Sequence, residues 1–232
     1  MAASSAILFF VALAIWLLTA WWDRRRVVLH QFACFWGSLY TWLIPAWPLT
    51  ITGKENIRRN ATYVMVSNHL SLLDILMYFR LFTHFKWVSK AEIFKVPFVG
   101  WNMVLNDYIP IRRGDPASAD EMFEACRRTL ARGSSIFMFP EGTRSPDGHP
   151  GRFKTGAFRI AQESRVPILP MAIRGTAQAL PKRTLDFRGR HPIHIQVLPE
   201  IPYQQIRDRP LEDVAVEVRD RIAEQLETRG GP

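Results

Sequence analysis

The sequence of this 232-residue chain predicts an α/β fold with a mixed, largely parallel sheet flanked by helices, preceded by an N-terminal hydrophobic helical membrane anchor. Short apolar runs of strand length alternate with helical patterns from residue 49 onward. The first 48 residues contain two long apolar stretches. A polar cluster around His69 stands where a strand gives way to a helix, a place where α/β folds carry binding sites. We therefore divide the chain into residues 1–48, the membrane-anchoring helices, and residues 49–232, the α/β domain.

The N-terminal apolar run has the features of an uncleaved anchor. Residues 6–22 are apolar except for Thr19, and a cluster of arginines at 24–26 follows them. At about 1.5 Å per helical residue the run covers roughly 25 Å, against a hydrocarbon core of about 30 Å. A signal peptide carries its positive charges before the apolar core, whereas here they come after it. We therefore expect a retained anchor whose C-terminal end lies on the cytosolic side.

A second apolar stretch, residues 27–49, is rich in tryptophan and interrupted by Pro45 and Pro48. Six of the eight tryptophans in the chain fall within the first fifty residues, and tryptophan favours the headgroup level of a membrane. The two segments predict either a helical hairpin that enters one leaflet or one or two crossings of the bilayer. The apolar pattern does not separate these alternatives.

Strands and helices of the second part follow from their periodicity. Apolar runs predict strands at 49–52, 62–67, 85–89, 107–111, 135–139, 166–173 and 193–198, the last one alternating as an edge strand would. Helical patterns cover 75–79, 117–132 with Gly133 as a C-terminal glycine, 156–162 and 211–226. Residues 93–101 are apolar but contain proline and glycine, and they suit ordinary core, a bilayer-facing segment or the wall of an acyl-chain slot.

The spacing of His69 and Asp74 is informative. Five steps of about 100° would put the two side chains roughly 140° apart on a continuous helix, so they meet only if His69 precedes the helix. Ser71 suits the N-cap, which makes Asp74 the third helical residue, directed back toward the imidazole. A carboxylate on one ring nitrogen leaves the other free to accept a proton. The alternative, a capping box of Ser71 and Asp74 beside an ordinary loop histidine, stays open from this motif alone.

A second polar cluster, Pro-Glu-Gly-Thr-Arg-Ser at 140–145, follows the apolar strand 135–139. A glycine-containing loop after a strand exposes backbone N–H groups, and Arg144 adds a charge suited to phosphate. Glu141 needs a partner of its own beside an anion, such as an arginine or a substrate hydroxyl. This cluster therefore predicts an anion site.

The charge of the chain points to an anionic partner. The formal net charge is +9 and the isoelectric point about 10.1, which suits nucleic acid, acidic lipid or a phosphorylated substrate. No nucleic-acid-binding signature is present, so we expect no nucleic-acid partner. Arg112 and Arg113 end the strand 107–111, where a pair of arginines either grips a phosphate or remains a solvated charge pair.

Cysteines and histidines do not predict a metal or a disulfide. Cys34 and Cys126 lie in an apolar segment and a helix, which favours a reducing compartment. His191 and His194 lack a carboxylate or thiol companion. We therefore expect no metal and no permanently bound cofactor.

Four blocks of residues stand together in a characteristic order. They are His-x4-Asp at 69–74, an arginine after a strand at 112, Glu-Gly-Thr-Arg at 141–144 and a proline-rich strand at 166–170. Together they resemble the membrane-bound glycerolipid acyltransferase family, most closely its 1-acylglycerol-3-phosphate (lysophosphatidic acid) acyltransferases. One block departs from the family pattern: Asn106 and Ile111 replace the usual glycine and acidic or small polar residue, and Pro110 interrupts the strand. The departure leaves the exact acceptor open.

The resemblance implies transfer of a fatty acyl group from acyl-CoA or acyl carrier protein to the free hydroxyl of a lysophospholipid, giving phosphatidic acid. It implies that His69 is the general base and that Asp74 orients it. The residues implied to hold the acceptor are Arg112, Glu141, Gly142, Thr143, Arg144 and, more weakly, Lys154. The chain contains no Gly-x-Ser-x-Gly elbow, in keeping with a reaction that needs no acyl-enzyme.

Other functions of the same residues remain alternatives. The acceptor of a related acyltransferase is glycerol-3-phosphate, another lysophospholipid or an amino-acid lipid. A hydrolase would use water in place of the alcohol, and a non-catalytic module would only bind lipid. In each case we expect a phospholipid membrane as partner, with the active domain on the cytosolic side, most simply of a bacterial inner membrane.

Overall fold

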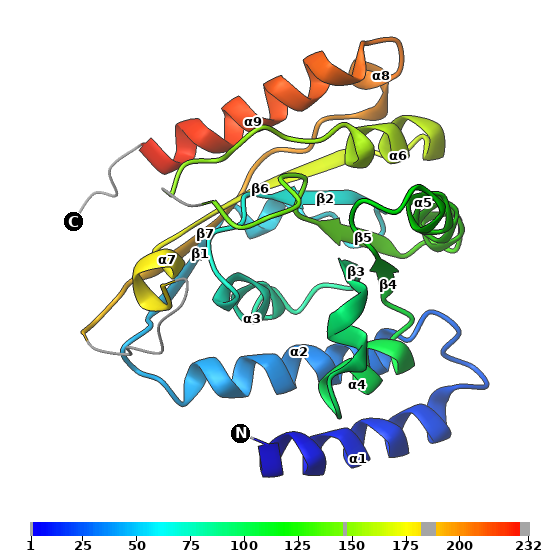
Figure 1. Ribbon diagram of the computed structural model, residues 1–232, viewed down its shortest axis with the longest axis vertical. Helices are drawn as coiled ribbons and strands as arrows, with labels where there is room; N and C mark the ends of the chain where they lie inside the picture. The colour runs from blue at the N-terminus through cyan, green and yellow to red at the C-terminus, as the bar shows by residue number, and fades with distance from the viewer. Residues whose placement is uncertain (1, 146–147, 182–188, 228–232) are drawn as a thin grey trace.

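The computed structural model describes residues 2–145, 148–181 and 189–227 (Figure 1). Its sheet has the strand order β1-β7-β6-β2-β5-β3-β4, and every neighbouring pair is parallel except β6 and β7. The strands are β1 (Leu49–Thr52), β2 (Val64–Ser67), β3 (Phe85–Lys90), β4 (Ile109–Ile111), β5 (Ser135–Met138), β6 (Ile168–Arg174) and β7 (Ile193–Val197). The predicted α/β class with a mixed, largely parallel sheet is confirmed.

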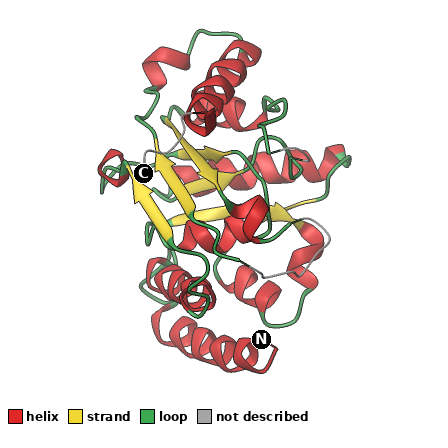
Figure 2. Ribbon diagram, turned by 90° about the vertical axis from the view of Figure 1, so that its left-hand side faces the viewer, coloured by secondary structure: helices red, strands yellow, loops and turns green. Residues whose placement is uncertain are grey.

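Helices cover both faces of the sheet (Figure 2). They are α1 (Ala2–Thr19), α2 (Val27–Trp42), α3 (Leu73–Phe79), α4 (Val99–Leu105), α5 (Pro116–Ala131), α6 (Gly156–Ser164), α7 (Thr176–Ala179), α8 (Tyr203–Ile206) and α9 (Leu211–Glu227), with short 3₁₀ turns η1 (Lys54–Asn56) and η2 (Ala91–Lys95). The helices α5, α6 and α9 lie on one face, and α2, α3 and α4 on the other (Figure 1).

Alternation along the strands divides the interior into two cores. Val64 and Val66 of β2 point to the face of α5, α6 and α9, while Met65 between them points to the face of α3. On the first face α9 packs on β6 through the buried Val214 and Val218, as its helical pattern predicts. Parallel strands covered on both faces read as continuous apolar runs, which is why the sequence revealed them.

The prediction that residues 193–198 form an edge strand is wrong. Strand β7 lies between β1 and β6 and is hydrogen-bonded to both. Its side chains alternate because Ile193 and Ile195 face the core while His194 and Gln196 are only half-buried. Alternation therefore indicates that one face of the sheet is less buried at that strand. It does not indicate whether the strand has a neighbouring strand on each side.

Pro110 does not interrupt its strand, contrary to our expectation. Residues 109–111 pair in register with residues 88–90 of β3. Strand β4 lies at the edge of the sheet, where a residue without an N–H group costs no ladder hydrogen bond on the open side.

The N-terminal apolar segments form two helices that pack on the α/β part. Helix α1 lies against α2 and α4, and α2 lies against α3 (Figure 1). Asp23 ends the turn between them, because its carboxylate accepts the N–H groups of Val27 at 2.9 Å and Val28 at 2.8 Å. Among the residues that the structure describes, no helix combines the length and the apolar character needed to cross a membrane. The alternative with transmembrane helices is therefore not confirmed, and the division of the chain at residue 48 stays a prediction.

A buried polar cluster ties α2 to the sheet. The ring of His30 bonds the Tyr108 hydroxyl through Nδ1 (2.8 Å) and the Thr83 carbonyl through Nε2 (3.0 Å). His84 packs edge-on against His30, with ring centroids 5.3 Å apart, and bonds the Ser134 hydroxyl. Because a carbonyl must receive an N–H, Nε2 of His30 carries the proton and Nδ1 accepts from the tyrosine. Helix α2 is thus held to two loops of the sheet by one neutral imidazole.

The buried histidines predict a loss of stability in acid. Burial, together with the nearby cation Lys86, lowers the pKa of His84 to about 3 and holds the pKa of His30 well below its usual value. The folded protein keeps both rings neutral while the unfolded chain takes up protons below pH 6.5, so stability falls as pH falls. We expect each ring to lower the free energy of unfolding by about 2 kcal/mol when the pH falls from 7.5 to 5.

Urea denaturation at the two pH values measures this loss, and His84→Gln should roughly halve it. Equal unfolding free energies at pH 7.5 and pH 5 would show that the rings are charged or solvated in the folded protein.

Candidate active site

His69 lies directly after β2, at the carboxyl end of the parallel strands, and its neighbour Asn68 anchors it there. The side-chain amide of Asn68 donates to the carbonyl of Ile173 and accepts its N–H, both at 2.9 Å. The side-chain amide thereby takes the place of a peptide group and adds two hydrogen bonds to those that join β2 and β6. Because Asn68 is fully buried, both of these bonds are protected from water.

Asp74 holds the turn and the ring at once. Its Oδ2 accepts from the N–H groups of Leu70 (2.7 Å) and Ser71 (2.9 Å) and contacts Nδ1 of His69 at 2.8 Å. This confirms the prediction that His69 lies in the turn before the helix, where Asp74 of the first helical turn meets it. The carboxylate is completely buried, and a ring nitrogen at that distance from it carries the proton.

The helix begins one residue later than predicted. Helix α3 starts at Leu73, so Asp74 is its second residue, and Leu72 occupies the N-cap position. The hydroxyl of Ser71 accepts weakly from the Leu73 N–H at 3.3 Å and donates to the Leu180 carbonyl at 2.7 Å. The reason for the shift is that Ser71 bonds to the segment after α7, which no local pattern reveals.

The loop after β5 clamps the peptide groups of His69. The His69 N–H donates to Oε1 of Glu141 at 2.9 Å, and the His69 carbonyl accepts the N–H of Ser145 at 2.7 Å. The second oxygen of Glu141 accepts the N–H of Gly151 at 3.0 Å. Burial raises the pKa of Glu141, and these two N–H groups oppose that shift. The partner that we expected Glu141 to need is therefore the backbone, not an arginine.

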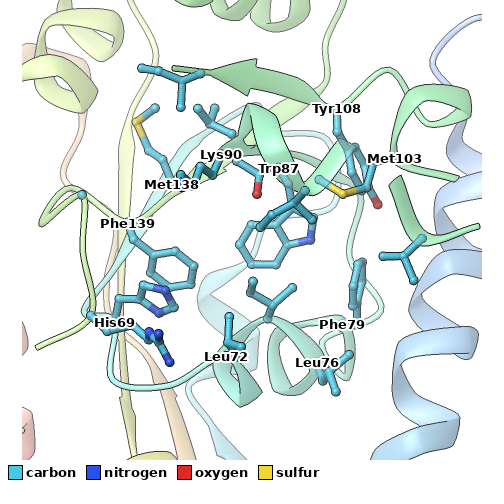
Figure 3. A pocket seen from close by; sticks show the side chains of 18 of the residues that line it. His69, Leu72, Leu76, Phe79, Trp87, Lys90, Met103, Tyr108, Met138 and Phe139 are labelled. Atoms are coloured by element: carbon cyan, nitrogen blue, oxygen red, sulfur yellow. The ribbon is translucent and has the colours of Figure 1, made fainter. Parts of the chain in front are cut away.

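The imidazole stacks on Phe139 and keeps one nitrogen free. The two ring planes are 13° from parallel, with centroids 4.1 Å apart. Nδ1 is occupied by Asp74, and Nε2 has no hydrogen-bond partner in the described part of the chain. His69 lines a cavity of about 710 Å³, so its free nitrogen is the one available to a bound molecule (Figure 3). A neutral imidazole in this state is a proton acceptor.

The charged side chains that line the cavity are cations. Of the described residues that line it, four are cations and none is acidic, the four being Lys90, Arg113, Arg144 and Lys154. Apart from Lys90, which lies 3.5 Å from Glu92, these cations have no ion-pair partner in the described residues. Cations that line the same cavity as a proton acceptor suit a ligand that carries both a phosphate and a hydroxyl.

Much of the remaining lining is apolar, and two helices supply a large part of it. Helix α2 contributes Ala33, Trp36, Gly37 and Tyr40, and the start and body of α3 contribute Leu72, Ile75, Leu76 and Phe79. Each set has the spacing of a single helix face. A Cβ atom on Gly37 would come within 2.5 Å of the Phe79 ring, so the glycine sets how closely the two helices approach. Figure 3 shows Leu72, Leu76 and Phe79 along the lower and right-hand side of the cavity, with Leu72 the nearest of the three to His69.

The structure brings most of the predicted site residues together. Gly142, Thr143, Arg144 and Lys154 line the cavity with His69, whereas Glu141 lies behind it and braces the backbone. Arg112 is not among the residues that line the cavity. Its guanidinium donates to the Asp115 carboxylate at 2.9 Å, and its peptide N–H donates to the Ser118 hydroxyl. No three potential metal-ligating side chains come together among the described residues.

Two lining cations were absent from the predicted site. Lys90 ends β3, and Arg113 follows β4. The signal for both was available: Lys90 directly follows the predicted strand 85–89, and Arg113 belongs to the arginine pair for which a phosphate grip was one of two alternatives. Residues 93–101 were expected to be ordinary core, a bilayer-facing segment or the wall of an acyl-chain slot. Ile93 and Val99 line the cavity, whereas Trp101 is half exposed.

Comparisons with known proteins agree with this geometry. The model of the Acyltransferase family matches residues 48–174. A 1-acyl-sn-glycerol-3-phosphate acyltransferase of Limnanthes alba is 36% identical, with 83% of this chain and 72% of that protein covered. A chloroplastic protein of the same name from Arabidopsis thaliana is 34% identical, over 88% of this chain and 55% of that protein. The chain spans about half the length of that relative and of those from Brassica napus and Chlamydomonas reinhardtii.

A solved structure has the same fold. The crystal structure of the 1-acyl-sn-glycerophosphate (LPA) acyltransferase PlsC from Thermotoga maritima superposes with a TM-score of 0.73 at 24% identity, covering 99% of this chain and 98% of that one. The family match covers more than half of the chain, including both polar motifs. This chain belongs to the acyltransferase family.

Proposed function

We propose that the chain is a 1-acylglycerol-3-phosphate O-acyltransferase of the EC 2.3.1 class, which moves a fatty acyl group from a thioester to the acceptor hydroxyl and forms phosphatidic acid. The observation that carries the proposal is a single cavity whose described lining combines the carboxylate-held imidazole of His69 with four cations and many apolar side chains, and which has no carboxylate among those described residues. The names of the relatives from Arabidopsis thaliana and Limnanthes alba support this acceptor.

His69 is the general base in this proposal. Its Nε2 takes the proton of the acceptor hydroxyl as that oxygen bonds to the thioester carbonyl carbon. The C–S bond of the tetrahedral intermediate then breaks, and the proton passes from the imidazolium to the departing sulfur. Asp74 keeps the proton on Nδ1 and stabilises the imidazolium between the two steps.

The cations of the cavity bind the acceptor's phosphate. Arg144 and Lys154 belong to the loop that clamps His69, so a phosphate held there is fixed relative to the base. Gly142 and Thr143 line the same wall. Glu141 acts through the backbone of His69, and the contact of Arg112 with Asp115 favours a structural role for that arginine.

The apolar part of the cavity, lined by α2 and α3, suits an acyl chain. Leu72, three residues after the base, belongs to this lining and is half exposed. The donor is acyl-CoA or acyl carrier protein used as a co-substrate, with no permanently bound cofactor. The cytosolic orientation and the bacterial inner membrane stay predictions of the sequence.

A membrane surface is the partner that suits the outer side of the N-terminal helices. Exposed apolar side chains gather on α1, on the turn after it and on α4, and they include Ile7, Phe10, Leu17, Leu18, Trp21, Trp22, Trp101 and Val104. Helix α1 packs on α4 through Phe9, whose ring lies 5.4 Å from that of Trp101. Because the two helices are joined, their exposed sides form one surface, which we propose to enter one leaflet.

An acceptor panel tests the proposed reaction. Purified protein is given labelled acyl-CoA with 1-acylglycerol-3-phosphate, glycerol-3-phosphate, other lysophospholipids or an amino-acid lipid. We expect transfer to 1-acylglycerol-3-phosphate with the highest kcat/KM. Release of free fatty acid alone would indicate a hydrolase, and binding without turnover would indicate a lipid-binding module.

Substitution of the base should abolish the reaction. We expect His69→Ala to lower kcat by at least about 10²-fold to 10⁴-fold, because the acceptor hydroxyl is not ionised at neutral pH without a base. Folding by circular dichroism and binding to vesicles should be unchanged. Substantial residual turnover in this variant would remove His69 as the base.

Glu141 should affect turnover more than acceptor binding. In Glu141→Gln the side chain keeps one acceptor oxygen, so one of the N–H groups of His69 and Gly151 loses its partner, at a cost of about 1–3 kcal/mol. We expect kcat to fall about 10-fold to 100-fold while the acceptor KM changes less than about twofold. The exposed Glu121→Gln serves as control. A rise in acceptor KM with an unchanged kcat would instead place Glu141 in contact with the acceptor.

A charge on α1 should weaken membrane binding. Leu18 is 73% exposed on α1, and Val216 is 57% exposed on α9, at the other end of the molecule (Figure 1). Loss of one buried leucine side chain from a bilayer costs about 1.5–3 kcal/mol. We therefore expect Leu18→Asp to lower co-sedimentation with anionic phospholipid vesicles at least about tenfold and Val216→Asp to leave it unchanged. Equal effects of the two substitutions would refute the proposed surface.

A further inference from the structure

The proposed reaction forms an imidazolium on His69 in a cavity that already contains positive charges. The charged side chains among the described lining residues are all cations, namely Lys90, Arg113, Arg144 and Lys154. In the described part of the chain, Asp74 is the one carboxylate bonded to the ring, and its Oδ2 is shared with two backbone N–H groups. A further contact that favours the charged ring over the neutral ring would therefore accelerate the reaction.

The ring of Phe139 makes such a contact. Its centroid lies 4.1 Å from that of the imidazole, and the two planes are 13° from parallel. At the separation of about 3.5 Å that carbon atoms in contact keep, the two ring centres are offset sideways by about 2 Å. The imidazole therefore lies over the face of the phenyl ring (Figure 3). Because an aromatic face is negative, this stack adds little attraction for a neutral imidazole but attracts an imidazolium.

Neighbouring rings hold Phe139 in this position. Trp87 of β3 lies 5.7 Å from it at 23° from parallel, and Tyr78 of α3 lies 6.3 Å from it; both are buried. Phe139 follows β5, the strand between β2 and β3 in the sheet, and comes two residues before Glu141. One short segment thus contacts the backbone of His69 through Glu141 and its side chain through Phe139.

We propose that Phe139 is a positioning residue whose ring face stabilises the imidazolium form of His69 during acyl transfer. This inference rests on the proposed function, because it requires His69 to accept the hydroxyl proton. The proton moves from the acceptor oxygen to Nε2 and then to the departing sulfur, so the ring is charged only while the tetrahedral intermediate forms and breaks down. A contact that acts only during this interval raises kcat and leaves the binding of both substrates unchanged.

Fluorination of Phe139 separates this electrostatic contact from packing. Mono-, di- and trifluorinated phenylalanine, introduced at position 139 through a reassigned stop codon, nearly keep the shape of the ring and remove negative charge from its face in steps. Transfer from palmitoyl-CoA to 1-acylglycerol-3-phosphate is measured for each protein. We expect kcat to fall with each added fluorine, to about 2-fold to 30-fold below that of the wild type in the trifluorinated protein. The KM of each substrate should change less than about twofold, because the shape of the cavity is kept.

The pH profile of Phe139→Leu gives a second readout. Leucine keeps an apolar side chain but has no aromatic face, so the imidazolium loses stability. We expect the acid side of the kcat/KM profile to move to lower pH by about 0.4 to 1.5 while the plateau falls. The acceptor's phosphate titrates in the same range but equally for every variant, so a difference between variants reports on the enzyme. Phe158→Leu is the matched control, because Phe158 is fully buried in the other core, and it should keep the wild-type profile.

Two results would overturn the proposal. One is an equal kcat for the fluorinated proteins and the wild type, which would show that Phe139 only packs against the base. The other is an acid side of the Phe139→Leu profile that stays in place or moves to higher pH, the second of which would show that the ring mainly shields the imidazole from water. Both leave the proposed function standing, whereas absence of acyl transfer by the wild type would overturn the two together.

Discussion

The clamp on the peptide groups of residue 69 is the interaction on which the rest of the site depends. Glu141 accepts the His69 N–H, and Ser145 donates to the His69 carbonyl, so the two polar motifs are joined by two buried hydrogen bonds. The motifs are far apart in the sequence but follow adjacent parallel strands, β2 and β5. A parallel sheet places the ends of such strands side by side, and the clamp then fixes the base against the loop that carries Arg144.

The cations and the apolar side chains that line the cavity come from different kinds of element. Strand ends carry the charges, because loops at the carboxyl edge of the sheet can present long cations without burying them among apolar side chains. Helices α2 and α3 supply much of the apolar lining, with one face of each helix turned toward the cavity and Gly37 allowing a close approach to Phe79. The base lines the same cavity as both sets of side chains, as the joining of a phosphorylated head to an acyl chain requires.

Helix α2, the second of the two N-terminal helices, also forms a wall of the site. Ala33 and Trp36 of α2 line the cavity, and His30 on the same helix is bonded to Tyr108, which lines it too. Helix α2 is therefore part of the packed structure and not a separate tether. A displacement of α2 would change the width of the apolar part of the cavity, so the predicted division at residue 48 describes composition better than it describes packing.

Local patterns in the sequence determined the strand and helix alternation and the turn in which Asp74 meets His69, because these depend on contacts within a few residues along the chain. Tertiary structure decided what depends on contacts between distant segments. It placed β7 inside the sheet, bonded Glu141 to the backbone of His69, and turned Arg113 toward the cavity while Asp115 held Arg112. The physical reason is that periodicity reports which face of an element is buried, whereas the partner of a polar group is set by whichever distant segment packs against it.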